Sequence, residues 1–116
     1  RSFYERILTL SNEPVFHSGQ WQLLEIQTAG DDTFRNLVAY QWLAKDAWKF
    51  VIVNLSATVS QARVRFPSGI SASQQYTFHD QLHDVRYLRF GEEIAQSGLY
   101  VRLDPYRAHL FDVAPQ

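Results

Sequence analysis

The sequence predicts an all-β fold, a sandwich or barrel of about eight short strands. Alternating apolar and polar residues recur in short segments from Gly19 to the end of the chain. Residues that favour turns, mainly glycine, proline and aspartate, separate these segments about every 8 to 12 residues. One neighbouring pair of segments has the form of a hairpin, and we place it at the centre of the predicted sheet.

The predicted hairpin joins residues 36–43 to residues 48–55 through the short break Ala44–Ala47. Both arms are rich in β-branched and aromatic residues, as strands are. Symmetric closure predicts three cross-strand pairs: Leu43 with Trp48, Gln41 with Phe50, and Ala39 with Ile52.

Both faces of this hairpin are largely apolar, whereas an antiparallel hairpin commonly keeps one face in water. If Phe50 and Ile52 face a second sheet, the residues between them face away from it. A contiguous apolar surface of that kind marks an interface. We therefore expect a domain interface on the second face, formed by Val38, Tyr40, Trp42, Val51 and Val53.

A short helix is expected before the first strand. Ser2 and Glu5 have the spacing of a capping box, and Pro14 ends the helical pattern. A helix of about three turns is too short to be stable alone in water, so its apolar stripe must be buried. This stripe consists of Phe3, Ile7 and Leu10, which we expect to extend the domain interface.

The remaining strands are expected where the alternation is clearest: residues 20–27, 62–66, 74–80, 85–90, 99–103 and 107–113. Residues 28–33 have the composition of a turn or loop. Arg63 and Arg65 alternate with apolar residues and are expected on the wet side of their strand.

Composition bounds the function. At 116 residues the chain suffices for one domain with its own core. A net charge of −1 gives no basic field for nucleic acid or an anionic membrane, and no apolar run approaches the roughly 18 to 20 residues of a membrane span. The chain has no cysteine, which is typical of a reducing compartment, and we expect a cytoplasmic location. It has no methionine and begins with Arg1, so we expect a piece of a longer protein.

Two His-Asp pairs stand four residues apart, His79-Asp80 and His83-Asp84. On a helix this spacing would bring both imidazoles to one face, where they could hold a metal with the carboxylates. The pairs lie between two predicted strands, however, where aspartates are typical of a polar turn. We therefore predict a turn here, and no metal or cofactor.

Adjacent acids occur at Asp31-Asp32 and Glu92-Glu93. Glycoside hydrolysis needs two carboxyl groups about 5 to 9 Å apart. Neighbouring side chains of a strand point to opposite faces, and acids in a loop are usually solvated. No glycine-rich phosphate loop and no recognisable Ser-His-Asp motif is present either. We therefore assign no catalytic residue and do not expect this chain alone to be an enzyme.

Tryptophan side chains could form a platform for sugar, because aromatic rings stack on the faces of pyranose rings. The candidates are Trp21, Trp42 and Trp48. At strand spacing, however, large aromatic residues more often fill the core. For Trp42, contact with a partner domain is the stronger hypothesis, because it lies on the second face of the hairpin.

Segments along nearly the whole chain follow one order: Phe3–Leu8, Glu13–Phe16, Gly19–Leu24, Asn36–Tyr40, Phe50–Ser56, Gly98–Leu103 and His109–Val113, with Asp80, Leu82, Tyr87, Gly91 and Pro105 between them. This order resembles the end of the last barrel helix and the following C-terminal β domain of α-amylase-type enzymes, glycoside hydrolase family 13. The resemblance implies an antiparallel Greek-key sandwich over residues 14–116. Residues 1–13 would be the remnant of the barrel helix.

In this family the catalytic carboxyl groups belong to an upstream (β/α)₈ barrel, and none of their motifs lies in this chain. The resemblance therefore implies a non-catalytic accessory domain of a glycoside hydrolase or transglycosidase, which stabilises the barrel and would contact α-glucan. Two alternatives stay open: an independent carbohydrate-binding module, and a β-sandwich that binds protein. In the isolated chain, a second copy would replace the barrel and cover the interface.

Overall fold

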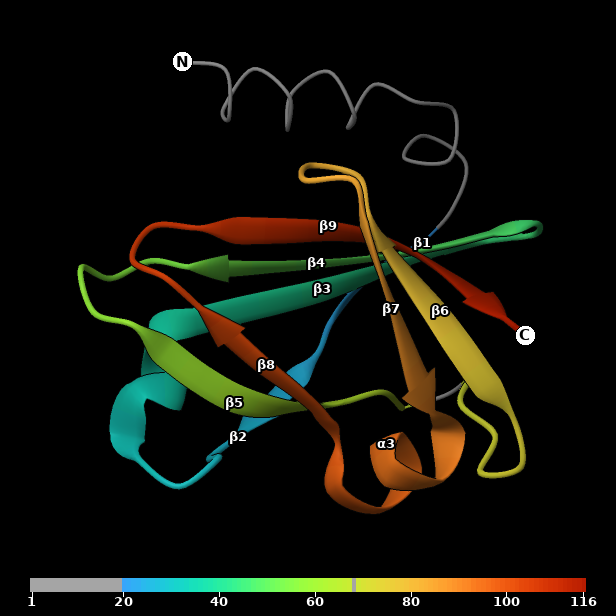
Figure 1. The fold of residues 1–116 in the computed structure, drawn as a ribbon, viewed down its shortest axis with the longest axis horizontal. Helices are drawn as coiled ribbons and strands as arrows, with labels where there is room; N and C mark the ends of the chain where they lie inside the picture. Colours follow the sequence, from blue (N-terminus) through green and yellow to red (C-terminus); the bar gives the residue numbers. More distant parts are fainter. Residues whose placement is uncertain (1–19, 68) are drawn as a thin grey trace.

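Two antiparallel sheets face each other in the structure, a computed structural model that describes residues 20–67 and 69–116 (Figure 1). The larger sheet has the order β1 (Gln20–Leu23), β3 (Leu37–Ala44), β4 (Ala47–Asn54), β9 (Ala108–Pro115), β6 (Gln75–Asp80) and β7 (Val85–Phe90). The smaller sheet has the order β2 (Glu25–Gln27), β5 (Ser60–Arg65) and β8 (Leu99–Leu103). The prediction of an all-β antiparallel sandwich is confirmed.

The hairpin of β3 and β4 lies in the middle of the larger sheet and has the predicted register. The structure pairs Leu43 with Trp48, Gln41 with Phe50, and Ala39 with Ile52. The pairing runs on to Ala44 and Ala47, so that only Lys45 and Asp46 form the turn. Strand β9 then pairs with the other edge of β4 and joins the hairpin to β6.

The predicted strand 20–27 is two strands that belong to different sheets. β1 pairs with β3 in the larger sheet, whereas β2 pairs with β5 in the smaller one. Leu24 lies between them, buried, and its amide donates to the carbonyl of Ala39. The alternating pattern does not reveal this crossing, because apolar residues continue on both sides of the bend.

Two short helices were not predicted as helices. The 3-10 helix η1 (Asp32–Asn36) begins after Asp31, whose carboxylate accepts from the amide of Thr33. The helix α3 (Gly91–Ser97) connects β7 to β8 and buries Ile94 in the core. A side chain on Gly91 would place its Cβ 1.9 Å from the carbonyl oxygen of Ser71, so only glycine fits there.

The two arginines of β5 lie against α3. Arg65 donates to the last carbonyl groups of the helix, those of Ala95 and Gln96. Arg63 forms an ion pair with Glu93, with 3.2 Å between Nη1 and Oε2. Both side chains are partly exposed, and they hold the helix on the smaller sheet.

The main core lies between the sheets and is aromatic at its centre. Phe50 and Phe111 stack with their ring centroids 5.6 Å apart, and Phe78 meets both rings edge-on. A second cluster lies on the opposite face of the larger sheet and consists of residues of alternate parity on the same strands, together with Leu82 from the turn after β6. Its buried members are Trp42, Leu82, Ala108 and Leu110. In the part of the chain that the structure describes, no helix is long and apolar enough to cross a membrane.

Candidate functional site

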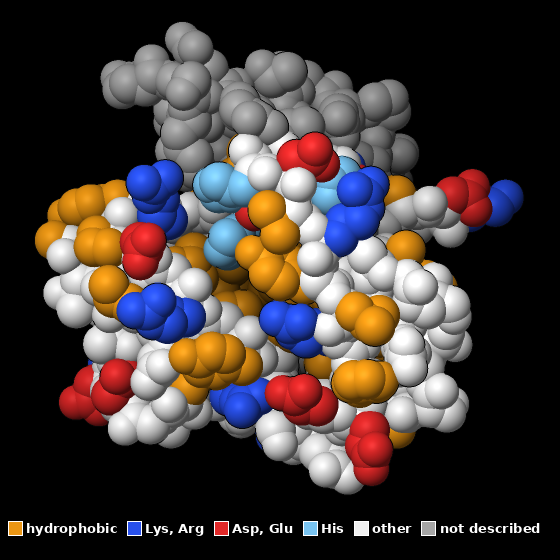
Figure 2. Space-filling view, in the orientation of Figure 1, with side chains coloured by type: hydrophobic (Ala, Val, Ile, Leu, Met, Phe, Trp, Pro, Cys, Tyr) orange, Lys and Arg blue, Asp and Glu red, His pale blue; other side chains and the backbone are white. Residues whose placement is uncertain are grey.

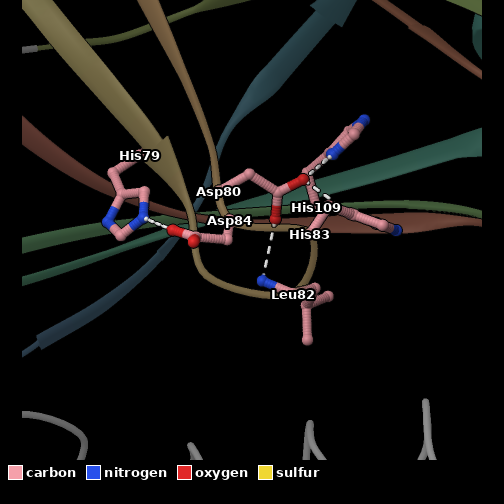
Figure 3. Close-up of polar contacts among 6 residues, drawn as sticks. All are labelled: His79, Asp80, Leu82, His83, Asp84 and His109. Atoms are coloured by element: carbon pink, nitrogen blue, oxygen red, sulfur yellow. Dashed lines mark hydrogen bonds and ion pairs between the residues drawn. The ribbon is translucent and has the colours of Figure 1, made fainter.

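Three polar side chains meet at one end of the larger sheet, on the side that faces the core. Asp80 ends β6, His83 lies in the turn to β7, and His109 comes from β9 (Figure 3). Oδ2 of Asp80 lies 2.7 Å from Nδ1 of His83 and 2.5 Å from Nδ1 of His109. We refer to these three residues as the Asp-His cluster.

The turn between β6 and β7 brings the cluster together. Oδ1 of Asp80 accepts from the amide of Leu82, 3.0 Å away, and the carbonyl of Asp80 accepts from the amide of Asp84. Asp84 has a φ of 55°, a left-handed conformation that Asp tolerates better than most residues. The turn therefore folds the chain back over Asp80 and places His83 beside its carboxylate.

Asp80 is fully buried, and its surroundings determine its charge. Burial raises the pKa of a carboxyl group. Hydrogen bonds from His109 and His83, the positive charge of His109 and the amide of Leu82 outweigh this and lower the pKa of Asp80 to about 2. The group is therefore a carboxylate at neutral pH.

A cleft opens beside the cluster. A polar cavity of about 390 Å³ is lined by all three members of the cluster and by residues of β7, β8 and the turn after it: Tyr87, Arg102, Leu103, Asp104 and Arg107. A second, more apolar cavity of about 210 Å³ shares Tyr87, Arg102 and His109 with it and continues between the sheets. Figure 2 shows a hollow on this face, with histidine and cationic side chains around it.

The structure separates the two predicted His-Asp pairs. Strand β6 sends neighbouring side chains to opposite faces, so that His79 lies on the far face of the sheet from Asp80. His79 binds Asp84 instead, with 2.8 Å between Nε2 and Oδ1 (Figure 3). A turn follows β6 at residues 81–84 and contains the second pair, but the prediction of Asp80 as a turn residue was wrong, because Asp80 is the last residue of the strand. The sequence did not point to His109, because His109 lies near Asp80 only through the pairing of β9 with β6. That pairing depends on the order of strands in the sheet.

The predicted interface residues of the hairpin share one face, opposite the main core. Trp42 is 3% exposed and Tyr40 is 38% exposed, and the remaining three are half-buried: Val38, Val51 and Val53. Beside them, Nζ of Lys49 lies 2.7 Å from Oδ1 of Asp112. We call this surface the outer face. The other predicted interface residues, Phe3, Ile7 and Leu10, and the predicted domain boundary near residue 13 lie outside the described residues.

The three tryptophans do not form a flat platform. Trp21 is 49% exposed and lies across from Trp42, with the rings edge to face and their centroids 4.6 Å apart. Trp48 lies on the core side, where its ring meets Phe66 and Tyr76 edge-on. Of the three, Trp21 has the most exposed side chain and Trp42 is buried.

Two of the four adjacent acids have structural roles, whereas Asp32 and Glu92 are exposed. Asp31 caps η1, and the hydrogen bonds from Thr33 lower the pKa of its carboxyl group. Glu93 pairs with Arg63. Glu92 lies exposed in the first turn of α3.

Comparison of the sequence with known proteins finds no matching protein-family model and no matching curated protein. The resemblance to the C-terminal domain of α-amylase-type enzymes therefore stays a prediction.

Proposed function

We propose that the chain is a non-catalytic accessory domain of an α-amylase-type glycoside hydrolase or transglycosidase, and that its outer face packs on the upstream catalytic barrel. The observation that carries this proposal is the apolar character of both faces of the larger sheet. One face builds the core with the smaller sheet, and the other carries a second apolar cluster.

The composition of the outer face supports docking. Trp42 and Tyr40 provide large aromatic contacts, which are enriched at protein interfaces. Val51 and Val53 continue the apolar surface toward Leu110 on β9. A surface of this kind is unusual on a sheet face that serves only to meet water.

The proposed roles of the barrel and of this domain follow from the chemistry of glycoside hydrolysis. A retaining glycosidase needs a nucleophile and an acid about 5 Å apart. The adjacent acids of this chain cap a helix, pair with an arginine or lie in solvent. The barrel would supply the reacting carboxyl groups, and this domain would stabilise the barrel. The absence of cysteine favours the cytoplasm as the location of the enzyme.

The first test is to determine the sequence that precedes Arg1 in the full-length protein. The proposal expects a (β/α)₈ barrel with its catalytic acids at the carboxyl ends of the strands. The isolated chain should hydrolyse no α-glucan. A different upstream domain, or turnover of a chromogenic maltoside that a point mutation in this chain abolishes, would contradict the proposal.

The second test compares two matched tyrosines in the full-length enzyme. Tyr40 on the outer face is 38% exposed, and Tyr100 on the smaller sheet is 39% exposed. Tyr40→Asp should lower the melting temperature of the barrel, because it buries a charge against the barrel. Tyr100→Asp should leave that temperature unchanged. Equal effects of the two substitutions would exclude the outer face as the docking surface.

One observation favours the alternative of a carbohydrate-binding module, in which the outer face would contact α-glucan in place of a barrel, because Trp21 lies on this face directly across from Trp42. Trp21 and Tyr40 are exposed side by side, with ring centroids 6.0 Å apart and an interplanar angle of 83°. Since the rings are nearly perpendicular, one sugar ring could not stack on both, and Trp21 is the more exposed of the two. Trp21→Ala should then abolish retention on an amylose column, whereas Trp48→Phe should leave it unchanged. Retention that survives Trp21→Ala would exclude this role.

A further inference from the structure

We propose that Asp80, His83 and His109 form a binding site for a divalent transition metal, with Zn²⁺ as the representative ion. The inference rests on the geometry of the Asp-His cluster and does not depend on the proposed function. All three side chains offer a ligand atom, and these atoms lie within 4.8 Å of one another.

The ligand atoms suit a metal ion of intermediate hardness. Two imidazole nitrogens and one carboxylate oxygen are common ligands of Zn²⁺, and two histidines with one carboxylate also hold Fe²⁺ in many proteins. Harder ions such as Mg²⁺ and Ca²⁺ prefer oxygen ligands only. The cluster therefore selects a first-row transition metal over the alkaline earths.

The distances need little adjustment. With metal–ligand bonds of about 2.1 Å, neighbouring ligand atoms lie about 3.0 to 3.4 Å apart in octahedral or tetrahedral geometry. The two nitrogen–oxygen distances of the cluster are 2.5 and 2.7 Å. Each would lengthen by less than about 1 Å to admit the ion. His83 can make this movement easily, because it lies in a turn and its side chain is 38% exposed.

One oxygen of Asp80 is shared by both histidines. The same oxygen of Asp80 faces Nδ1 of both histidines, and each nitrogen must carry a hydrogen to donate to it. A bound ion replaces both of these hydrogens and satisfies the carboxylate and the two nitrogens together. The ordinary alternative is a hydrogen-bonded cluster that only stabilises the turn.

The surroundings supply what a metal site needs beyond its ligands. The amide of Leu82 binds the second oxygen of Asp80 and thereby orients the carboxylate, as outer hydrogen bonds do in metal sites. The cleft beside the cluster holds about 390 Å³, enough for water in the remaining coordination positions. Arg102 and Arg107 line the same cleft, so that an anion would be favoured as an additional ligand.

The test is metal titration of the tag-free chain after treatment with a chelator. Calorimetry with ZnCl₂ should show one equivalent bound per chain, and Co²⁺ should give the visible absorption of a nitrogen and oxygen site. His83→Ala is the main variant, because His83 is partly exposed and its loss leaves the core intact. It should weaken Zn²⁺ binding by more than about 10-fold, the lower bound for losing even an outer partner of a metal site.

His79→Ala is the matched control. His79 also contacts an aspartate at 2.8 Å, but it lies outside the cluster. The control should bind Zn²⁺ as the unmodified chain does, and circular dichroism should show that both variants are folded. Absence of stoichiometric binding by the unmodified chain, or an equal loss of affinity in the two variants, would overturn the proposal and leave the cluster as a stabiliser of the turn.

Discussion

The two faces of the larger sheet are built from the same strands but differ in how they combine apolar and charged residues. On the core side, one row of cross-strand neighbours runs through Gln41, Phe50, Phe111 and Asp80. Its centre is purely aromatic, and its polar members lie toward the edges. The first polar end is Gln41, which accepts from the indole of Trp48, and the other is the Asp-His cluster.

On the outer face, an apolar row and a charged row lie next to each other. Tyr40, Val51 and Leu110 form the apolar row, and the adjacent row runs from Trp42 through Lys49 and Asp112 to His79. Apolar contact with charges at its margin is the composition of a protein interface. The difference between the faces is that one is a closed core, whereas the other combines partly exposed apolar side chains with a row of charges.

The largest effect should come from the core side. Phe50→Ala removes a ring that stacks on Phe111 and should lower the free energy of unfolding by about 3 to 5 kcal/mol, through lost burial and a cavity. Val53→Ala on the outer face is the contrasting variant. Its half-buried side chain should cost less than about 1.5 kcal/mol. Urea denaturation measures the free energy of unfolding of both variants. Equal losses would contradict the distinction between a closed core side and a partly exposed outer face.

The next largest effect should be on stability in acid, and it comes from Asp80 at the polar end of the core-side row. The pKa of Asp80 falls from 3.8 to about 2 on folding. Its carboxylate therefore stabilises the fold fully above about pH 4, and this contribution of about 2 kcal/mol disappears as the pH falls through 2. Asp80→Asn, measured in the presence of a chelator, should reduce the loss of stability between pH 4 and pH 2 by about 2 kcal/mol.

Asp84→Asn is the control for this experiment. His79 also lowers the pKa of Asp84, but that carboxyl group is exposed to solvent. The variant should keep nearly the whole acid dependence of the unmodified chain. If the acid dependence of stability falls equally in the two variants, it is not governed by the burial of Asp80 in the cluster.

The ion pair of the outer face should have the smallest effect and should be asymmetric. The side chain of Lys49 is 7% exposed and that of Asp112 is 39% exposed. Asp112→Asn removes the negative charge beside a buried ammonium, which keeps its contact with Gln81, and should cost about 1 kcal/mol, a value discounted for the exposure of Asp112. Lys49→Met leaves a partly exposed carboxylate that still accepts from the side-chain amide of Gln81, and should cost less than half as much. Denaturation in low and high salt measures both, and the reverse order would show that Lys49 is not held by this pair.

The sequence could predict the hairpin and the separation of its faces, because both depend on local alternation. Closure of a short turn places Phe50 and Ile52 on one side and Val51 and Val53 on the other. The bend at Leu24 and the helix α3 could not be predicted from this pattern. Apolar residues continue through the bend, and α3 buries only Ile94 and Gly91, too few to show a helical period.

The Asp-His cluster could be predicted only in part. Asp80 and His83 are close in sequence, and a turn brings them together without help from the rest of the fold. His109 reaches them because β9 lies between β4 and β6. No local pattern specifies that strand order, so the third member of the cluster becomes visible only in the folded chain.

The most direct test of the outer face as a docking surface is photo-crosslinking in the full-length protein. A benzophenone amino acid replaces Tyr40 in one sample and Tyr100 in the other, two sites of nearly equal exposure on different sheets. Mass spectrometry then identifies the crosslinked peptides. We expect position 40 to crosslink to the upstream barrel and position 100 to give no such product. Crosslinks to the barrel from position 100 alone, or from neither position, would contradict docking through the outer face.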